Sequence, residues 1–201
     1  MGVIGELLFY RRDQVDLDAV LRNKVDAVRA VVDRLSDHEF ATKKNDELAA
    51  LVDKSERMTP LEVHFDKATP HVEEAQVDVQ DQFGFEGGTV RVAGLMATKT
   101  IPFSGDSMLW SLRTNPYNLN PPRGVVRGQN LVIGITVRVQ QADEAKRYID
   151  DVIARLPEYL GWQRSQIETY NNGLTGRAMP RIQERRARLS QASDVLKKLQ
   201  G

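Results

Sequence analysis

The fold depends most on one stretch of sequence, Ile101 to Gly124, which reads IPFSGDSMLWSLRTNPYNLNPPRG. It is rich in Gly, Pro and Asn and follows neither a helical nor a strand period, so it predicts a loop. It also holds large apolar side chains that a soluble loop rarely leaves in water. These are Phe103, Met108, Leu109, Trp110 and Tyr117. We therefore predict a loop that packs onto the core.

On both sides of this loop, residues 60–140 show the alternation of apolar and polar side chains that is typical of strands. Strands are expected at 61–65, at 72–79, at 89–101 with a bulge or break at Gly94, and at 129–140. The last of these is the strongest, because it is rich in β-branched residues. Glycines at 83–88 predict a turn. Short connections without intervening helices favour an antiparallel sheet.

Helical periodicity appears on both sides of the predicted sheet. In residues 11–58, apolar residues recur at alternating steps of four and three and so form one apolar seam, which predicts a first helix. A second helix is expected from Asn45 or Asp46 to about Arg57. The first seam consists of Leu21, Val25, Val28, Val32 and Leu35. Residues 2–10 predict a short strand or a docked tail.

Residues 142–200 also predict helices, kinked or interrupted at Pro157, with a last helix beginning near Pro180. The seam of that last helix, Ile182 to Leu199, can pair with the valine seam near the N-terminus. We predict an α+β fold, a single domain over 1–201. Its antiparallel sheet is flanked by N- and C-terminal helices that pair as a helical hairpin or bundle.

Composition excludes several classes of protein. The chain of 201 residues carries 28 basic and 28 acidic side chains, so any attraction to a charged partner must come from a local patch. It contains no cysteine, which excludes disulfides and thiolate chemistry. No apolar run approaches the length that spans a membrane. A cytoplasmic protein without a membrane partner is expected.

The common short signatures of nucleotide binding, serine hydrolysis and zinc proteolysis are absent. Glu144 and Lys146 match the letters of a nuclease element but open a helix, where acids favour the positive helix end. A metal site at His64, Asp66 and His71 would require residues 61–65 and 72–79 to pair as a hairpin. We predict no catalytic residue, metal or cofactor.

Two groups of residues are candidates for binding. Residues 176–201 carry seven basic and two acidic side chains, and arginine forks suit phosphate oxygens. The candidates there are Arg181, Arg185, Arg186 and Arg188. In the loop, Arg113 and Arg123 with Trp110 and Tyr117 can stack on bases or engage a peptide. The alternatives are a solvated helix face for the first group and loop packing for the second.

Three phrases carry a resemblance to a known family: PLEVHFD from Pro60, FSGDSMLWSLRTNPYNLNPPRG from Phe103, and YLGWQRSQIETYNNGL from Tyr159. The chain resembles, over roughly residues 35–192, the N-terminal region of bacterial restriction-endonuclease-like proteins of the PD-(D/E)XK-associated group. In such proteins the nuclease residues follow this region, so none is carried over here. The resemblance implies a recognition, regulatory or assembly module of a bacterial defence system.

These inferences predict a non-catalytic recognition or assembly subunit that binds a protein effector or itself, with nucleic acid as a further candidate partner. Two other interpretations stay open. One is a metal-dependent hydrolase built around His64, Asp66 and His71. The other is a purely structural homo-oligomer built on the helical seams.

Overall fold

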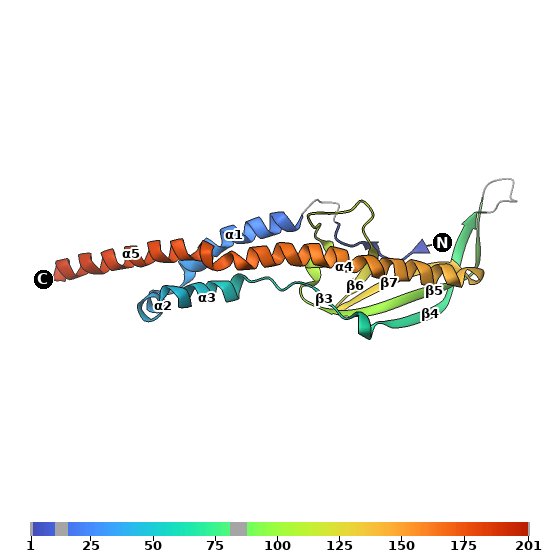
Figure 1. The fold of residues 1–201 in the computed structure, drawn as a ribbon, viewed down its shortest axis with the longest axis horizontal. Helices are drawn as coiled ribbons and strands as arrows, with labels where there is room; N and C mark the ends of the chain where they lie inside the picture. The colour runs from blue at the N-terminus through green and yellow to red at the C-terminus, as the bar shows by residue number, and fades with distance from the viewer. Residues whose placement is uncertain (1, 11–15, 81–87, 201) are drawn as a thin grey trace. The chain divides into compact units, whose positions relative to one another are not determined.

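The computed structural model describes residues 2–10, 16–80 and 88–200. Its contacts divide the chain into two compact units (Figure 1). The sheet unit consists of Met1–Leu17 and Pro60–Arg164, and the helical unit of Asp18–Thr59 and Ser165–Gly201. The sequence predicted one domain with a change from helix to sheet at 58–60, and the boundary between Thr59 and Pro60 falls at that point.

The sheet unit holds short and long strands, single turns of 3-10 helix, and most of a long helix. The strands are β1 (Gly2–Val3), β2 (Glu6–Leu7), β3 (Glu62–Val63), β4 (Thr69–Gln80), β5 (Thr89–Ser104), β6 (Arg123–Arg127) and β7 (Asn130–Arg138). The 3-10 turns are η1 (Phe65–Lys67), η2 (Ser107–Ser111) and η3 (Val139–Gln141), and the helix is α4 (Ala142–Asn172).

The strands form one antiparallel sheet in the order β2-β6-β7-β5-β3, with β1 also on β7 and β4 also on β5. This confirms the predicted antiparallel arrangement. The long β5 lies between β4 and β7, so it is the central strand of the sheet. No break interrupts it at Gly94, which pairs with Ala75 on one side and Arg138 on the other. A Cβ at Gly94 would collide with Val77, so close packing explains this glycine.

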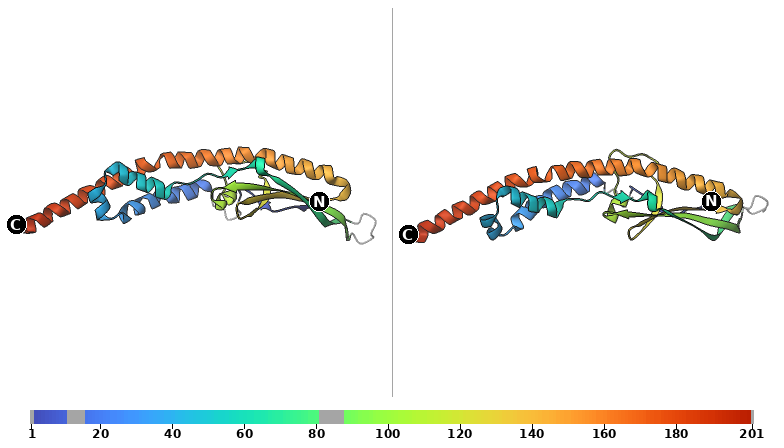
Figure 2. Two further views of the ribbon diagram at one scale, coloured as in Figure 1. Left: turned by 90° about the horizontal axis from the view of Figure 1, so that it is seen from below. Right: turned by 60° about the horizontal axis from the view of Figure 1, so that its bottom comes forward.

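One face of the sheet forms the core of its unit, because α4 lies across it (Figure 2). Ile133, Ile135 and Val137 alternate along β7 toward this face and are buried. Ile135 and Val137 pack with Ala145 of α4. Burial of such aliphatic side chains stabilises a fold by about 1.5–3 kcal/mol each. The apolar side chains that recur at every second residue of β7 therefore pack against those that recur about every 3.6 residues along α4.

The helical unit contains α1 (Leu17–Arg34), α2 (Asp37–Thr42), α3 (Asn45–Glu56), the end of α4, and α5 (Leu174–Gln200). Val28 and Val32 of the predicted seam are buried, as is Ile182 of α5. Asn171 ties the end of α4 to the chain after α3, since its side chain accepts from the Met58 N–H and donates to the Met58 carbonyl. The predicted pairing of N- and C-terminal helices is confirmed.

The predicted span of the second helix is confirmed, since α3 runs from Asn45 to Glu56, but its cap, the helix before it and the start of the last helix were not predicted correctly. The short helix α2 was not predicted; its capping box of Ser36 and Glu39 is a recognisable start signal. At α3, Lys44 occupies the N-cap instead of Asn45 or Asp46, and the Glu47 carboxylate accepts from its backbone N–H. Helix α5 begins at Leu174, well before Pro180.

Pro157 does not interrupt its helix, and the last helix does not begin near Pro180. Pro157 lies inside α4 and Pro180 inside α5, and both helices continue through them. A proline removes one intrahelical hydrogen bond, and the burial of Leu156, Tyr159 and Ile182 offsets that loss. The end of α5 does not pair as predicted, because Leu196 and Leu199 are exposed, the latter by 79%.

The stretch 101–124 is docked as predicted, but it is not all loop. Its first residues end β5, η2 follows, and Arg123 begins β6, which the sequence did not predict as a strand. Phe103, Leu109 and Trp110 are buried, whereas Met108 and Tyr117 are exposed. Glycine and proline in the sequence concealed two short ordered elements. Of the predicted turn at 83–88, all but Gly88 lies outside the described residues.

Candidate functional site

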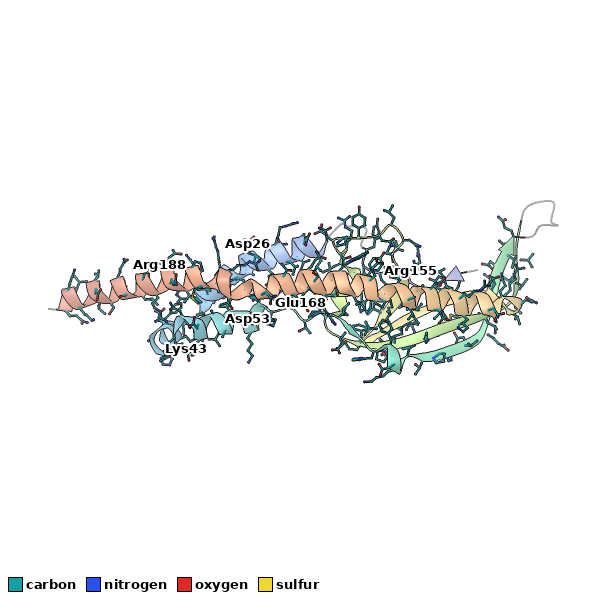
Figure 3. All side chains as sticks on the ribbon, viewed as in Figure 1. Asp26, Lys43, Asp53, Arg155, Glu168 and Arg188 are labelled. Atoms are coloured by element: carbon teal, nitrogen blue, oxygen red, sulfur yellow. The ribbon has the colours of Figure 1, made fainter. Side chains whose placement is uncertain are left out.

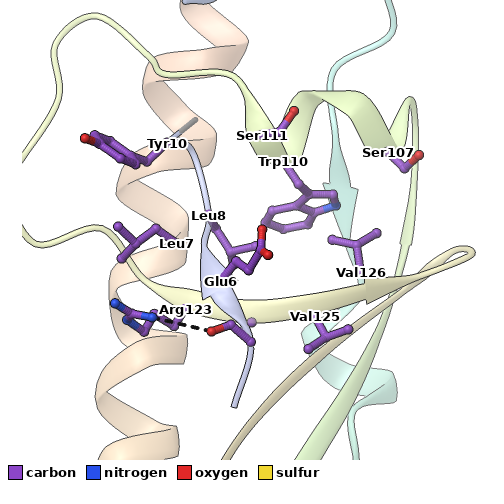
Figure 4. A pocket seen from close by; sticks show the side chains of 12 residues that line it. Glu6, Leu7, Leu8, Tyr10, Ser107, Trp110, Ser111, Arg123, Val125 and Val126 are labelled. Carbon is purple, nitrogen blue, oxygen red and sulfur yellow. Dashed lines mark hydrogen bonds between the residues drawn. The ribbon is translucent and has the colours of Figure 1, made fainter. Parts of the chain in front are cut away.

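The sheet unit contains an open cleft of about 1000 Å³, which we call the edge cleft (Figure 4). Three segments that are distant in sequence line it: the chain around β2, the η2 turn, and β6. The lining residues are Gly5, Glu6, Leu7, Leu8, Tyr10, Ser107, Trp110, Ser111, Arg123, Gly124, Val125 and Val126. Its volume lies within the range of ligand-binding sites in proteins, about 300–1,000 Å³.

A turn at Gly5 places the first wall of the cleft. Gly5 has φ of 88°, a left-handed conformation that favours glycine, and a Cβ there would collide with the Gly124 backbone. The chain then runs antiparallel to β6, and the Leu8 N–H donates to the Pro122 carbonyl at 2.8 Å. The Phe9 N–H donates to the Trp110 carbonyl, which joins this wall to η2.

Trp110 supports the second wall. Its side chain is 2% exposed, and its ring centroid lies 5.3 Å from that of Phe9 and 5.4 Å from that of Phe103. Gln163 of α4 donates from its side-chain amide to the Leu109 carbonyl at 2.9 Å. These contacts hold η2 on the core, so the cleft has a rigid back.

Strand β6 forms the third wall, and one of its edges is open. It pairs with β2 through Arg123 and Gly124, and with β7 through Val125 to Arg127. Residues 125–127 therefore have a strand on one side only among the residues that the structure describes. Val125 and Val126 point to opposite sides of β6 (Figure 4), yet both line the cleft. Because consecutive side chains of a strand alternate, the cleft must run along the strand edge.

The cleft contains charged groups of both signs. Glu6 and Arg123 are exposed, and the Arg123 Nη1 lies 3.5 Å from the Gly5 carbonyl oxygen. Ser107 and Ser111 add hydroxyls, and the Ser111 hydroxyl donates to the Met108 carbonyl at 2.7 Å. Such a cleft can hold a ligand that presents apolar surface, a backbone edge and a single charge.

The structure brings together only some of the predicted binding residues. Trp110 and Arg123 line the edge cleft, whereas Arg113 and Tyr117 do not. The Arg113 guanidinium lies 4.9 Å from the centre of the Tyr117 ring, and its Nη2 lies 3.5 Å from the Asp16 carboxylate. Tyr117 is 53% exposed. These two residues form a separate cation–π pair on the loop.

Most of the predicted arginines of α5 already bind acceptors within the helical unit. The Arg181 Nε donates to the Asp33 carboxylate at 2.9 Å, and its Nη1 donates to Glu184 at 2.8 Å. The Arg185 Nη1 donates to the carbonyls of Val32 and Asp33, at the end of α1. The hydrogen bond from Arg181 lowers the pKa of Asp33 below its ordinary value.

Arg186 makes a similar set of bonds to the segment that joins α2 and α3. Its three nitrogens each donate at 2.7 Å, to the Asn45 side chain and to the carbonyls of Phe40 and Lys43. Carbonyls at helix ends lack intrahelical partners, so arginine satisfies a structural need at these positions. Arg188 is exposed (Figure 3).

Sequence reasoning missed Glu6, Ser107, Ser111 and the edge of β6. The signal for β6 was present as the apolar pair Val125 and Val126 next to a Gly128-Gln129 turn, but Pro121 and Pro122 favoured a loop. The position of Glu6 depends on the turn at Gly5, whose partner Gly124 lies more than a hundred residues away in sequence. Nothing local could have revealed that contact.

The hairpin required by the metal interpretation does not form. Strand β3 pairs with the end of β5 through Glu62 and Val63, and β4 pairs with β5 farther along. His71 is exposed, and its Nε2 lies 3.5 Å from Glu73. Among the described residues, no group of three or more His, Asp or Glu side chains is placed to hold a metal ion.

No protein-family model matches the chain, and neither a curated protein nor a solved structure matches it. The resemblance to restriction-endonuclease-like proteins stays a prediction. In the part of the chain that the structure describes, no helix is long and apolar enough to cross a membrane.

Proposed function

We propose that the chain is a non-catalytic recognition subunit that binds an extended segment of a protein partner in the edge cleft. One observation carries this proposal: the cleft follows the open edge of β6 at residues 125–127. An extended peptide can add to such an edge as a further strand. Main-chain hydrogen bonds supply affinity, and the pockets beside the edge select side chains.

The composition of the cleft supports this kind of ligand. Unpaired backbone groups on a strand edge attract another strand, and proteins usually cover or charge such edges. Here the edge is flanked by Trp110, which is fixed in the core, and by the charged Arg123 at the start of β6. A partner segment with apolar side chains and an acidic group near Arg123 would complement it.

The partner that we propose is an effector protein of a bacterial defence system, because that is the context implied by the resemblance of residues 103–124 and 159–174. Nucleic acid remains a weaker candidate. Arg181, Arg185 and Arg186 donate to acceptors of their own chain, so phosphate contacts there would have to replace existing hydrogen bonds. On α5, Arg188, Lys197 and Lys198 are exposed basic residues.

The test is selection from a phage-displayed library of random peptides against the whole chain, followed by anisotropy measurements with the selected peptide labelled. The variant Arg123→Glu reverses the charge at the cleft. The control is Arg147→Glu on α4, because Arg147 is also exposed but neither lines the cleft nor lies on the open edge of β6. We expect Arg123→Glu to weaken binding about tenfold, which corresponds to one charge-assisted contact.

Two results would contradict the proposal. One is a selection that yields no peptide specific for the folded chain. The other is a peptide whose affinity falls equally in both variants, since that would place binding outside the edge cleft or make it a response to net charge. Circular dichroism on each variant separates loss of binding from loss of fold.

A further inference from the structure

A second hollow of the sheet unit, which we call the apolar groove, lies between the first half of α4 and the β4 side of the sheet. Its volume is about 490 Å³. The lining is mostly aliphatic: Ala68, Pro70, Val72, Leu95, Ala97, Val137, Ala142, Ala145 and Ile149, with Thr98, Lys99, Lys146 and Asp150 as its polar members. Small-molecule sites typically combine an apolar lining with a few polar groups in this way.

The groove exists because α4 covers only part of the sheet. On β7 the covered side chains, such as Val137, are fully buried, whereas Val72 on β4 is 58% exposed. Strand register places Val72 beside Ala97, so these side chains lie on the same face as the core. The sheet therefore continues its apolar face past the helix that covers it.

Lys99 occupies an unusual position for a cation. It lies on the central strand β5, paired with Pro70 on one side and with the fully buried Ile133 on the other. Its side chain is half-buried on the apolar face. Lysine is seldom placed among aliphatic side chains without a partner. Among the described residues, Lys99 forms no hydrogen bond or ion pair through its amine.

The other charges of the groove already satisfy each other. The Lys146 Nζ donates to the Asp150 carboxylate at 2.5 Å, one helical turn along α4. This hydrogen bond, and more weakly the charge of Lys99, lower the pKa of Asp150, so the carboxyl group stays ionised at neutral pH. Two lysines and one aspartate leave a net charge of plus one, which belongs to Lys99.

We propose that the apolar groove binds a small amphiphile with one anionic head, of the class of medium-chain carboxylates. Its chain lies against Val72, Leu95 and Ala97, and its carboxylate accepts a hydrogen bond from Lys99. The ligand buries the exposed aliphatic face and gives Lys99 a hydrogen-bonded anion, which Asp150 does not supply because its carboxylate is bonded to Lys146. This site is separate from the edge cleft and does not depend on the proposed peptide function.

The experiment is a ¹⁵N-HSQC titration of the whole chain with octanoate, octan-1-ol and octyltrimethylammonium, which share one tail and differ in head charge. We expect shifts confined to β4, β5, the part of β7 around Val137 and the first half of α4. Octanoate should bind about tenfold more tightly than octan-1-ol, because a charge-assisted hydrogen bond is added. The cationic probe should bind most weakly.

Two variants locate the contacts. Lys99→Gln should remove the preference for octanoate over octan-1-ol and leave octan-1-ol binding unchanged. Val72→Glu should weaken octanoate binding at least tenfold. Its control is Val90→Glu, because Val90 is a similarly exposed valine, at 49%, that does not line the groove.

The proposal is overturned if millimolar octanoate causes no localised shifts in a folded sample. It is also overturned if all three probes bind equally, or if Lys99→Gln keeps the preference for the anion. The spectrum of each variant reports directly whether the sheet unit is folded, so a failure to bind is not confused with unfolding.

Discussion

The arginines of α5 and the aromatic stretch around Trp110 are similar as sequence signals but differ in the structure. Both combine groups that commonly bind nucleic acid or peptide. In the helical unit, Arg181, Arg185 and Arg186 donate to acceptors of α1, α2 and neighbouring residues. In the sheet unit, Trp110 is buried but forms the back of a cleft that leaves Arg123 exposed.

The difference shows that a count of charges does not measure the charge available to a partner. A long arginine side chain can bond the ends of neighbouring helices, yet it still counts as a positive charge in the sequence. Conversely, a buried aromatic residue can define a binding surface without touching the ligand. Substitutions in these two regions should therefore differ in their effects on stability.

The largest effect is expected from Trp110→Ala. It removes a fully packed ring that contacts Phe9 and Phe103, and should lower the free energy of unfolding by about 4 kcal/mol. The exposed Tyr117 is the matched aromatic residue of the same stretch, and Tyr117→Ala should change stability by less than about 0.5 kcal/mol. Urea denaturation followed by circular dichroism measures both. Equal effects would mean that the stretch is not anchored by Trp110.

Among the arginines, Arg186→Gln should be the most damaging. It removes three hydrogen bonds and leaves the carbonyls of Phe40 and Lys43 without their donor, so we expect a loss of about 2 kcal/mol. Arg188→Gln, two residues along the same helix, removes the same charge from an exposed position and should be nearly neutral. If denaturation shows equal losses, the arginines do not divide into structural and exposed groups.

The contribution of the ion pair between Arg181 and Asp33 to the stability of the fold should depend on pH. The hydrogen bond from Arg181 lowers the pKa of Asp33 from its ordinary value of 3.8 in the folded chain. A carboxyl group with a lowered folded pKa stabilises the fold above its unfolded pKa, and this contribution is lost as the pH falls through the folded pKa.

Arg181→Gln should therefore lower the Tm by about 2 °C between pH 5 and pH 7, and the difference should shrink below pH 4. Thermal melts at a series of pH values measure it. Arg34→Gln is the control, because Arg34 donates to the Ala30 carbonyl, which does not titrate. A difference that persists unchanged at pH 2 would assign the effect of Arg181 to packing instead of the ion pair.

The smallest effect concerns Tyr159 of α4. Its ring stacks on Phe9 with centroids 5.1 Å apart, but its buried hydroxyl has no hydrogen-bond partner among the described residues. Burial raises the pKa of this phenol. Tyr159→Phe keeps the ring and removes the unsatisfied group, so stability should stay equal or rise by up to about 1 kcal/mol. A loss of more than 1 kcal/mol in urea denaturation would show that the hydroxyl does form a stabilising bond.

The sequence was sufficient where one repeating pattern decides the structure. The valine seam predicted α1, and the β-branched run at 131–139 predicted β7, because burial of one face imposes a period that can be read locally. It was insufficient where distant contacts decide. The last helix was predicted to begin near Pro180, but α5 begins at Leu174 and continues through this proline, since packing around Ile182 outweighs the lost hydrogen bond.

The candidate site was predictable only in part. Trp110 and Arg123 were identified because aromatic and guanidinium groups are common at binding surfaces. The edge cleft itself required knowledge of the turn at Gly5 and of strand pairing at β6. Likewise, no local pattern could show that Arg186 would reach the carbonyls near residue 40. Tertiary contacts therefore determine which of the candidate residues can bind a partner.

The most direct test of the central claim is amide hydrogen exchange at Val125, Val126 and Arg127, measured by NMR with and without a peptide selected against the chain. Consecutive amides of a strand point to opposite edges, and residues 125–127 already pair with β7 on one side. If the peptide adds to the open edge of β6, those of the three amides that point to this edge should exchange at least about tenfold more slowly in the complex, because each gains a main-chain hydrogen bond. The amides that point to β7 should change little and serve as an internal control. Protection that appears on α5 and leaves β6 unchanged would contradict the account and return the binding surface to the basic helix.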